Sequence, residues 1–280
     1  MSGGAFKGVR EGLLAANYRY LQKYVHQTTG VVLDESKQYL LESRLLPVVQ
    51  ANGVESLDDL CNVLRAGRSR DLVQQIVEAM TTHETLFFRD PDQYEALRRT
   101  VIPELMAQRA AARRLSFWSA AASFGQEAYS LAMILLDMEL QDWRIDILGT
   151  DISEQTLERA REGHYMPVEI GRGLSKVYLQ RYFTLRGLDW ELAPAVRRMV
   201  RFERRDLRER FIGLGPFDVI FCRNVLIYFD QETKRQILDE LWRALNPNGY
   251  LLLGGTESLL NLPVRFQRRS IGPAILYQAI

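Results

Sequence analysis

Residues 115–151, LSFWSAAASFGQEAYSLAMILLDMELQDWRIDILGTD, decide the fold of this chain. An apolar run is followed by a turn of small residues, an amphipathic helix pattern and a second apolar run that ends on an acid. Two apolar strands around such a helix form a βαβ unit, and a crossover of this length makes the two strands parallel. The stretch therefore predicts an α/β fold.

The turn from Ala120 to Gly125 contains no large side chain except Phe124, so a ligand could approach its backbone closely. Asp151 stands at the carboxyl end of the second strand, where an acid can accept hydrogen bonds from ribose hydroxyls. Asp151 or Ser153 could instead cap the helix that follows. The pattern favours a nucleoside site and leaves both interpretations of Asp151 open.

Two common nucleotide sites are disfavoured by the same stretch. A dinucleotide site needs G-x-G-x-x-G at the turn, where only Gly125 is present, and the chain has no G-x-x-x-x-G-K-[ST] motif. A nicotinamide dehydrogenase and a P-loop enzyme are therefore not expected.

The composition is that of an ordinary globular protein. The chain has 280 residues, 47% of them hydrophobic and 25% charged, and a formal net charge of +1. That length allows two domains, and that charge gives no overall attraction to nucleic acid or membrane. The two cysteines, Cys61 and Cys222, are far apart, so no metal is expected. No apolar segment suits a secretion signal or a membrane span, and we expect a cytoplasmic protein.

Four helical patterns occupy residues 17–80, and three of them stop at a glycine. We predict an all-helical N-terminal domain over residues 1–80. Its second helix carries Lys37 and Arg44, on a face that is either solvated or a contact surface.

Residues 81–92 form a linker with unusual composition, since Phe87 and Phe88 stand directly before Arg89. Paired aromatic residues in a linker indicate that it is packed into a cleft. The alternative is a plain hinge in which Arg89 pairs with a neighbouring aspartate.

The remaining residues, 93–280, alternate between strands and helices. The predicted helices are 126–140, 153–162 and 230–245, and the predicted strands are 115–120, 145–150, 199–204, 217–222, 249–254, 264–270 and 274–279. Seven strands with a closing pair joined at Gly272 and Pro273 favour the methyltransferase arrangement over a six-stranded dinucleotide fold. Its ligand is expected at the carboxyl ends of the first strands.

Residues 165–198 interrupt the alternation. The segment FTLRGLDWELA alternates around Gly187 as a hairpin does, so we predict a small β-subdomain inserted at the rim of the sheet. Such inserts more often shape access to a site than carry its chemistry.

Five motifs together resemble the CheR-type chemotaxis receptor methyltransferases: TTHETLFFRD, FWSAAASFGQEAYS, GTDIS, GPFDVIFCRNVLIYFD and LNPNGYLLLGGTES. The resemblance covers about residues 25–280. It implies a seven-stranded Rossmann-like sheet with a β-subdomain insert and an all-helical N-terminal domain. It also implies methyl transfer from S-adenosylmethionine, with S-adenosylhomocysteine as product, to glutamates of methyl-accepting chemotaxis receptors.

The resemblance implies a set of cofactor-binding residues. In the linker, Thr85 and Arg89 fall on cofactor-contacting positions, and His83 stands where the family usually has Asn. Asp151 falls on the ribose-binding acid. The turn and the helix after it contribute Ala120, Gly125 and Glu127.

Further positions follow the third and fourth predicted strands. Asp206 and Leu207 replace the family's Asn-Leu near the adenine, and an Asp can accept from the adenine amino group as an Asn oxygen does. Arg223, Asn224 and Tyr228 line up with the methionine and sulfonium end of the cofactor.

Methylation of a carboxylate needs alignment more than acid or base catalysis. A glutamate of pKa ~4.3 is already ionised near neutral pH, so no general base is required. The enzyme has to position the reactants and exclude water. The predicted catalytic residues are Arg89, which could fix the substrate carboxylate or the cofactor's carboxylate, and Tyr228, which could orient the reacting centre. The chain lacks the N/D-P-P-Y signature of many nucleic-acid methyltransferases, so no nucleic-acid substrate is expected.

The preferred interpretation is a monomeric protein-glutamate O-methyltransferase, with Lys37 and Arg44 offering positive charge to an acidic receptor helix. The loop RGLDWELAP is compact, so binding of a receptor C-terminal peptide by the insert is not expected. One alternative is a methyltransferase with another protein or a small carboxylic acid as substrate. The other is a non-catalytic module that senses the cofactor, which the presence of Arg89 and Tyr228 disfavours.

Overall fold

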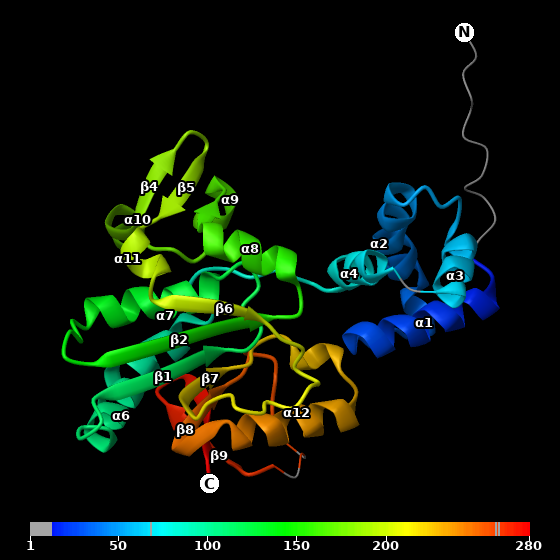
Figure 1. The fold of residues 1–280 in the computed structure, drawn as a ribbon. Coiled ribbons are helices and arrows are strands. Elements are labelled where there is room, and N and C mark those ends of the chain that lie inside the picture. Colours follow the sequence, from blue (N-terminus) through cyan, green and yellow to red (C-terminus); the bar gives the residue numbers. More distant parts are fainter. Residues whose placement is uncertain (1–12, 68, 261, 263) are drawn as a thin grey trace. The chain divides into compact units, whose positions relative to one another are not determined.

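The computed structural model describes residues 13–67, 69–260, 262 and 264–280. The chain divides into two compact units, Met1–Thr82 and His83–Ile280 (Figure 1). In the part of the chain that is described, no helix combines the length and the apolar character needed to cross a bilayer.

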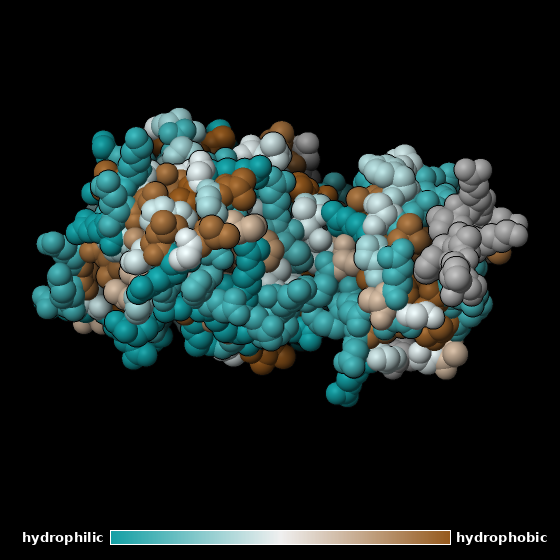
Figure 2. All heavy atoms as spheres, turned by 90° about the horizontal axis from the view of Figure 1, so that it is seen from above, coloured by the Kyte–Doolittle hydropathy of each residue, from teal (hydrophilic) through white to brown (hydrophobic). Residues whose placement is uncertain are grey.

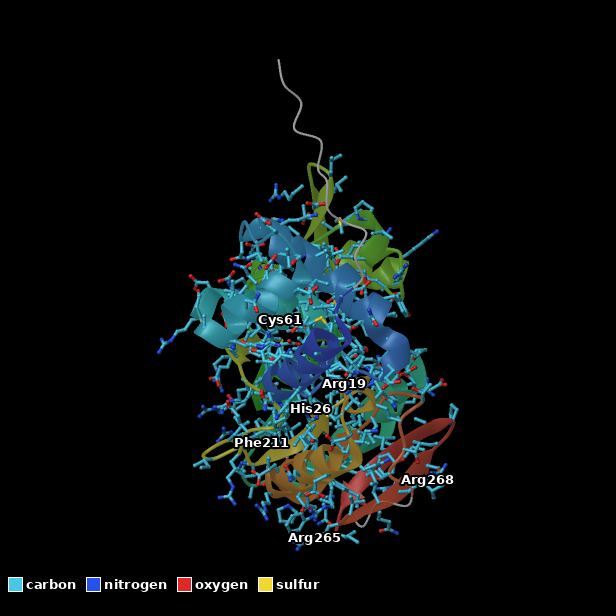
Figure 3. The ribbon with its side chains drawn as sticks, turned by 90° about the vertical axis from the view of Figure 1, so that its right-hand side faces the viewer. Arg19, His26, Cys61, Phe211, Arg265 and Arg268 are labelled. Carbon is cyan, nitrogen blue, oxygen red and sulfur yellow. The ribbon has the colours of Figure 1, made fainter. Side chains whose placement is uncertain are left out.

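The first unit consists of helices around one apolar core. The elements are α1 (Ala15–Thr29), the short 3-10 helix η1 (Glu35–Lys37), α2 (Gln38–Ala51), α3 (Leu57–Ala66) and α4 (Arg70–Met80). Gly30 ends α1 in the left-handed conformation, with φ of 77°, and the Ser56 side chain caps α3 by accepting from the Asp59 N–H. Figure 3 shows Cys61 on α3, where it is buried in the core.

The second unit contains the predicted seven-stranded sheet. Its strands are β1 (Arg114–Ser119), β2 (Arg144–Asp151), β6 (Val200–Arg204), β7 (Phe217–Phe221), β8 (Leu245–Leu252), β9 (Phe266–Ile271) and β10 (Ala274–Ala279). Their order is β6-β2-β1-β7-β8-β10-β9; the first five are parallel, and β10 pairs antiparallel with both β8 and β9. The strand β8 begins earlier than the predicted residue 249, because Leu245 already pairs with Phe217 before a shift in register.

Helices cover both faces of this sheet. They are α5 (Pro91–Ala96), the π-helix η2 (Leu97–Val101), α6 (Ile102–Gln108), α7 (Gln126–Asp137), α8 (Glu154–Glu162), the 3-10 helix η3 (Leu226–Tyr228) and α12 (Gln231–Arg243). On β1, Phe117 packs in the core that contains α7, and Trp118 packs in the core that contains α12. This alternation is expected of a central strand that is buried on both faces.

The insert is a three-stranded antiparallel sheet with short helices around it. Its strands, in the order β3-β5-β4, are β3 (His164–Tyr165), β5 (Asp189–Leu192) and β4 (Phe183–Arg186). The hairpin turns at Gly187, whose φ is 64°. The sequence did not predict its helices, α9 (Pro167–Ile170), α10 (Lys176–Tyr182) and α11 (Pro194–Arg197). Viewed from above, the molecule shows hydrophobic residues scattered among hydrophilic ones (Figure 2).

Candidate functional site

The turn after β1 is tied to both neighbouring strands. The Ala120 N–H donates to the carbonyl of Phe221 at 2.8 Å, and the Ala122 N–H donates to the carbonyl of Thr150 at 2.8 Å. Gly125 has φ of 90°, and a Cβ there would lie 2.8 Å from the Tyr129 ring. Only glycine fits this position, so the backbone that opens α7 is held close to the carboxyl ends of the strands.

Asp151 lies at the end of β2 and faces this turn. Its carboxylate accepts from the Ser123 N–H at 2.9 Å and from the Ser153 N–H at 3.1 Å. The helix α8 is capped by Ser153, whose hydroxyl accepts from the Thr156 N–H at 3.0 Å. Ser153 is therefore the helix cap, and the Asp151 carboxylate stays at the strand end where a nucleoside would bind.

The linker is fastened to this edge through its backbone. The Ser123 hydroxyl donates to the carbonyl of His83 at 2.7 Å, and the Ser130 hydroxyl accepts from the Phe88 N–H at 2.9 Å. Thr85 lies between these two attachments and is half-buried. The segment that carries the predicted residues is thus held in place rather than free.

The linker aromatics pack into the insert. The Phe87 ring is fully buried and lies edge-on to Tyr165, with ring centroids 4.9 Å apart. The Phe88 ring packs against the ring of Tyr178 in α10, with ring centroids 4.7 Å apart. Aromatic pairs of this geometry contribute about 0.5–1.5 kcal/mol each beyond their burial. The insert therefore stabilises the conformation of the segment that ends at Arg89.

Gly173 of the insert lies directly against the linker backbone. Its φ is 82°, and a Cβ there would lie 2.0 Å from the carbonyl oxygen of Phe87.

We expect Gly173→Ala to displace the linker and to raise the KM for S-adenosylmethionine by about ten-fold or more, because a shift of about 1 Å in a positioned group is costly. The control is Gly187→Ala, where φ is also positive but nothing lies within 4 Å. Equal KM values for the two variants would contradict the positioning role of this contact.

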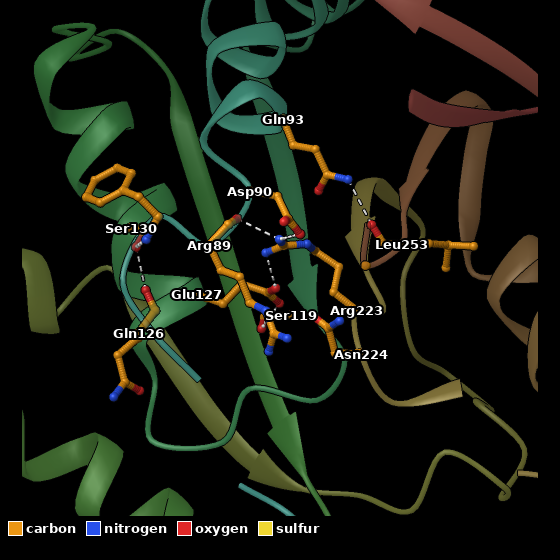
Figure 4. A network of polar contacts seen from close by, with 12 residues as sticks. Arg89, Asp90, Gln93, Ser119, Gln126, Glu127, Ser130, Arg223, Asn224 and Leu253 are labelled. Carbon is orange, nitrogen blue, oxygen red and sulfur yellow. Dashed lines mark hydrogen bonds and ion pairs between the residues drawn. The ribbon is translucent and has the colours of Figure 1, made fainter. Parts of the chain in front are cut away.

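A buried ion cluster joins the linker, α7 and β7 (Figure 4). The Arg223 side chain is 2% exposed and donates from Nη1 to Glu127 Oε2 at 3.0 Å. Its Nη2 donates to the carbonyl of Arg89 at 2.6 Å and to Asp90 Oδ2 at 2.5 Å. Glu127 also accepts from the Ser119 hydroxyl at 2.7 Å. The hinge interpretation required Asp90 to pair with Arg89. Asp90 pairs with Arg223 instead.

Burial and charge act against each other in this cluster. Burial lowers the pKa of Arg223, but the attraction of Glu127 and Asp90 outweighs it, and the pKa lies above its ordinary value. Burial raises the pKa of Glu127 above its ordinary value, and the charge of Arg223 and the Ser119 hydroxyl offset only part of that rise. Arg223 is therefore the main group that favours the charged form of this buried carboxyl.

The remaining predicted residues lie after β6 and β7. The Asp206 carboxylate accepts hydrogen bonds from Nε and Nη2 of Arg208. Leu207, the next residue, is buried. Asn224 adopts a left-handed conformation with φ of 57°, and Tyr228 is half-buried at the end of η3. All of these residues follow strands whose carboxyl ends lie at the same edge of the sheet.

Glu257 joins the ends of β7 and β8 and was not singled out from the sequence. Its Oε2 accepts from the Asn224 N–H at 2.6 Å and from the Gly254 N–H at 2.8 Å. It thus holds Asn224 in its unusual backbone conformation. The only sequence signal was its place in the motif GGTES, which does not reveal that two backbone donors converge on it.

Lys37 and Arg44 lie in the helical unit and have partners there. Lys37 Nζ lies 3.3 Å from Asp34 Oδ2. Arg44 donates to the carbonyl of Met80 at 3.0 Å and to the Thr82 hydroxyl at 2.9 Å, so it satisfies the carboxyl end of α4. Within the described ranges, no group of three or more His, Cys, Asp or Glu residues is arranged to hold a metal ion.

Comparisons with known proteins match both units. Residues 83–274 match the family described as CheR methyltransferase, SAM binding domain, and residues 16–81 match CheR methyltransferase, all-alpha domain. Chemotaxis protein methyltransferase 1 of Pseudomonas aeruginosa is 41% identical over 270 residues, which cover 94% of this chain and 98% of the relative. Chemotaxis protein methyltransferase Cher2 of Pseudomonas putida is 39% identical over 94% of this chain and 98% of the relative. Chemotaxis protein methyltransferase of Vibrio parahaemolyticus is 41% identical over 93% of this chain and 96% of the relative.

Proposed function

The chain belongs to the CheR methyltransferase family and is an S-adenosylmethionine-dependent methyltransferase, and on this premise we propose that it esterifies glutamate side chains of chemotaxis receptors. The observation that carries the proposal is the attachment of the Arg89 segment to the strand ends by Arg223, Ser123 and Ser130. This attachment supports the proposal because it holds the backbone that carries Arg89 at the edge of the sheet where we expect the cofactor. A guanidinium there suits a carboxylate acceptor.

The residues at this edge fit S-adenosylmethionine. The turn from Ala120 to Gly125 contains only small residues apart from Phe124, and a carboxylate such as that of Asp151, at the end of β2, can accept hydrogen bonds from ribose hydroxyls. Gln126 Oε1 is buried at the start of α7 without a partner among the described residues. We propose that Asp151 binds the ribose, that Asp206 and Leu207 bind the adenine, and that His83, Thr85 and Asn224 contact the rest of the cofactor.

For methyl transfer to a carboxylate, the main task of the protein is to position the two reactants. When bound, the cofactor supplies a methyl group on a positively charged sulfur. The glutamate nucleophile is already ionised at neutral pH, so no residue of the chain has to act as a general base. Arg89 would orient a carboxylate, Tyr228 would orient the reacting centre, and the packed linker would exclude water. Arg223 would position Arg89 without contacting the reactants, through its hydrogen bond to the Arg89 carbonyl.

The function is tested with cofactor labelled in its methyl group and membranes that contain chemotaxis receptors. We expect label on the receptor that base releases, as from an ester. A receptor with its methylated glutamates replaced by alanine is the control and should stay unlabelled. If the protein binds the cofactor but labels no receptor, the family stands and the substrate proposal is wrong.

The helical unit gives a separate prediction. We expect Arg44→Glu to raise the apparent KM for the receptor several-fold with little change in kcat, because it removes positive charge from an encounter with an acidic helix. Steady-state kinetics at low ionic strength measure it. Because Arg44 also caps α4, Arg44→Gln, which is neutral and can still donate to that helix end, is measured beside it. An unchanged KM in the charge reversal would count against receptor contact at Arg44.

A further inference from the structure

One face of the main sheet is polar over its amino-terminal half. On β1, Arg114 and Ser116 share a face with Trp118, and on β2, Arg144 and Asp146 share it with Leu148. Trp118 and Leu148 are buried in the core that contains α12, whereas Arg114 and Arg144 are exposed. A parallel sheet is normally apolar on both faces because helices cover them. The polar half-face therefore marks a region that no helix covers.

The chain connection explains why this region is open. The helix α7 connects β1 to β2, and α12 connects β7 to β8, but residues 205–216 between β6 and β7 contain no helix. A hollow of about 1030 Å³ remains, and residues 213–216 of this connection form part of its wall. The hollow lies at the amino ends of the strands, so it is separate from the candidate active site at their carboxyl ends.

Positive charge exceeds negative charge in this hollow. Its walls include five arginines and three acids; the arginines are Arg109, Arg114, Arg144, Arg198 and Arg201. Asp146 Oδ2 is shared by Arg114 Nε at 2.8 Å and Arg144 Nε at 3.5 Å. Arg198 is exposed and has no ion pair among the described residues. Two guanidiniums on one carboxylate, together with Arg198, leave donors for an anion.

The walls also offer an apolar side. Trp143 is half-buried and lines the hollow with Leu136, Leu140 and Met199. These four residues pack against the core that contains α7, so the hollow extends around the amino ends of the strands to that face of the sheet. Guanidinium groups bind phosphate through paired hydrogen bonds, and an indole ring can stack on a base. The volume suits a ligand of nucleotide size. We propose that this hollow binds a nucleoside di- or triphosphate, with the phosphates on the arginines and the base against Trp143.

The test is isothermal titration calorimetry of the full chain with ATP, carried out in saturating S-adenosylhomocysteine so that the cofactor edge is filled. We expect saturable binding that weakens at least about ten-fold in Arg198→Glu and in Arg144→Glu. The control is Arg99→Glu, because Arg99 is 78% exposed on η2 and does not line the hollow. Its affinity for ATP should equal that of the wild type. Affinity for S-adenosylhomocysteine, measured separately, should be unchanged in all three variants and reports that they are folded.

Three results would overturn the proposal. They are the absence of saturable ATP binding to the wild type, equal ATP affinity in Arg198→Glu and wild type, and loss of ATP binding as S-adenosylhomocysteine fills its own site.

Arg198→Glu breaks no ion pair of the described residues, so its folding is the least affected. Inorganic triphosphate serves as a further probe. If it binds as tightly as ATP, the nucleoside part of the proposal is wrong.

Discussion

Replacement of Arg89 by alanine is expected to reduce methyl transfer to receptor membranes by about 10²-fold or more, because a positioned charged donor is lost. Arg89 is half-buried, and its backbone is held by Arg223 at 2.6 Å, so the truncation leaves the linker in place. Burial raises the pKa of Glu127, and the Arg89 guanidinium is near enough to oppose part of that rise (Figure 4). The measurement is the initial rate of base-labile label on the receptor.

The same variant distinguishes the two proposed partners of Arg89. If Arg89 orients the cofactor's carboxylate, Arg89→Ala weakens cofactor binding in calorimetry. If it orients the substrate carboxylate, cofactor affinity is retained and the kcat/KM for the receptor falls. Arg89→Lys is the matched control, since it keeps the charge and loses the planar fork. Wild-type rates in Arg89→Ala would remove Arg89 from the catalytic residues.

Replacement of Arg223 by methionine is expected to lower the free energy of unfolding by about 3–5 kcal/mol, because the buried Glu127 carboxyl loses its ion-pair partner. Arg223 also supports Arg89 and Asp90, so methyl transfer should fall with it. Urea denaturation monitored by circular dichroism measures the stability. The double variant Arg223→Met, Glu127→Gln removes both charges and should recover much of the loss.

The pH dependence of this variant has a defined sign. Burial already raises the pKa of Glu127 in the wild type, and loss of the Arg223 charge, which opposes that rise, moves the pKa further above its value in the unfolded chain. The folded state then binds the proton more tightly, so stability falls as the pH rises through the Glu127 pKa. The double variant should not show this slope. A single variant as stable as the wild type at neutral pH would show that the ion cluster does not support the linker.

Much of the fold was predictable because it depends on local pattern. The stretch from β1 to β2 shows its strands and helix by periodicity alone, and the small residues up to Gly125 mark a turn. The hairpin of the insert was visible from the alternation around Gly187. The helices α9 to α11 were missed because they span only four to seven residues. Segments that short show too few turns for a helical period to be recognised.

In the candidate site, the sequence could predict the position only of residues that stand next to their own strand. Asp151 at the end of β2 needs no distant partner to be recognised. By contrast, Arg223 bonds Asp90 across 133 positions of sequence and Glu127 across 96. Glu257 bonds Asn224 across 33. No spacing rule predicts such pairs.

By itself, the sequence determined the α/β class, the family and its cofactor, because hydrophobic periodicity and short motifs are properties of neighbouring residues. The tertiary structure decided which side chains meet: Ser153 and not Asp151 caps α8, and Asp90 pairs with Arg223 and not with Arg89. The physical reason is that a charge in a protein interior persists only beside its counter-charge, and that neighbour is set by how strands and linker pack.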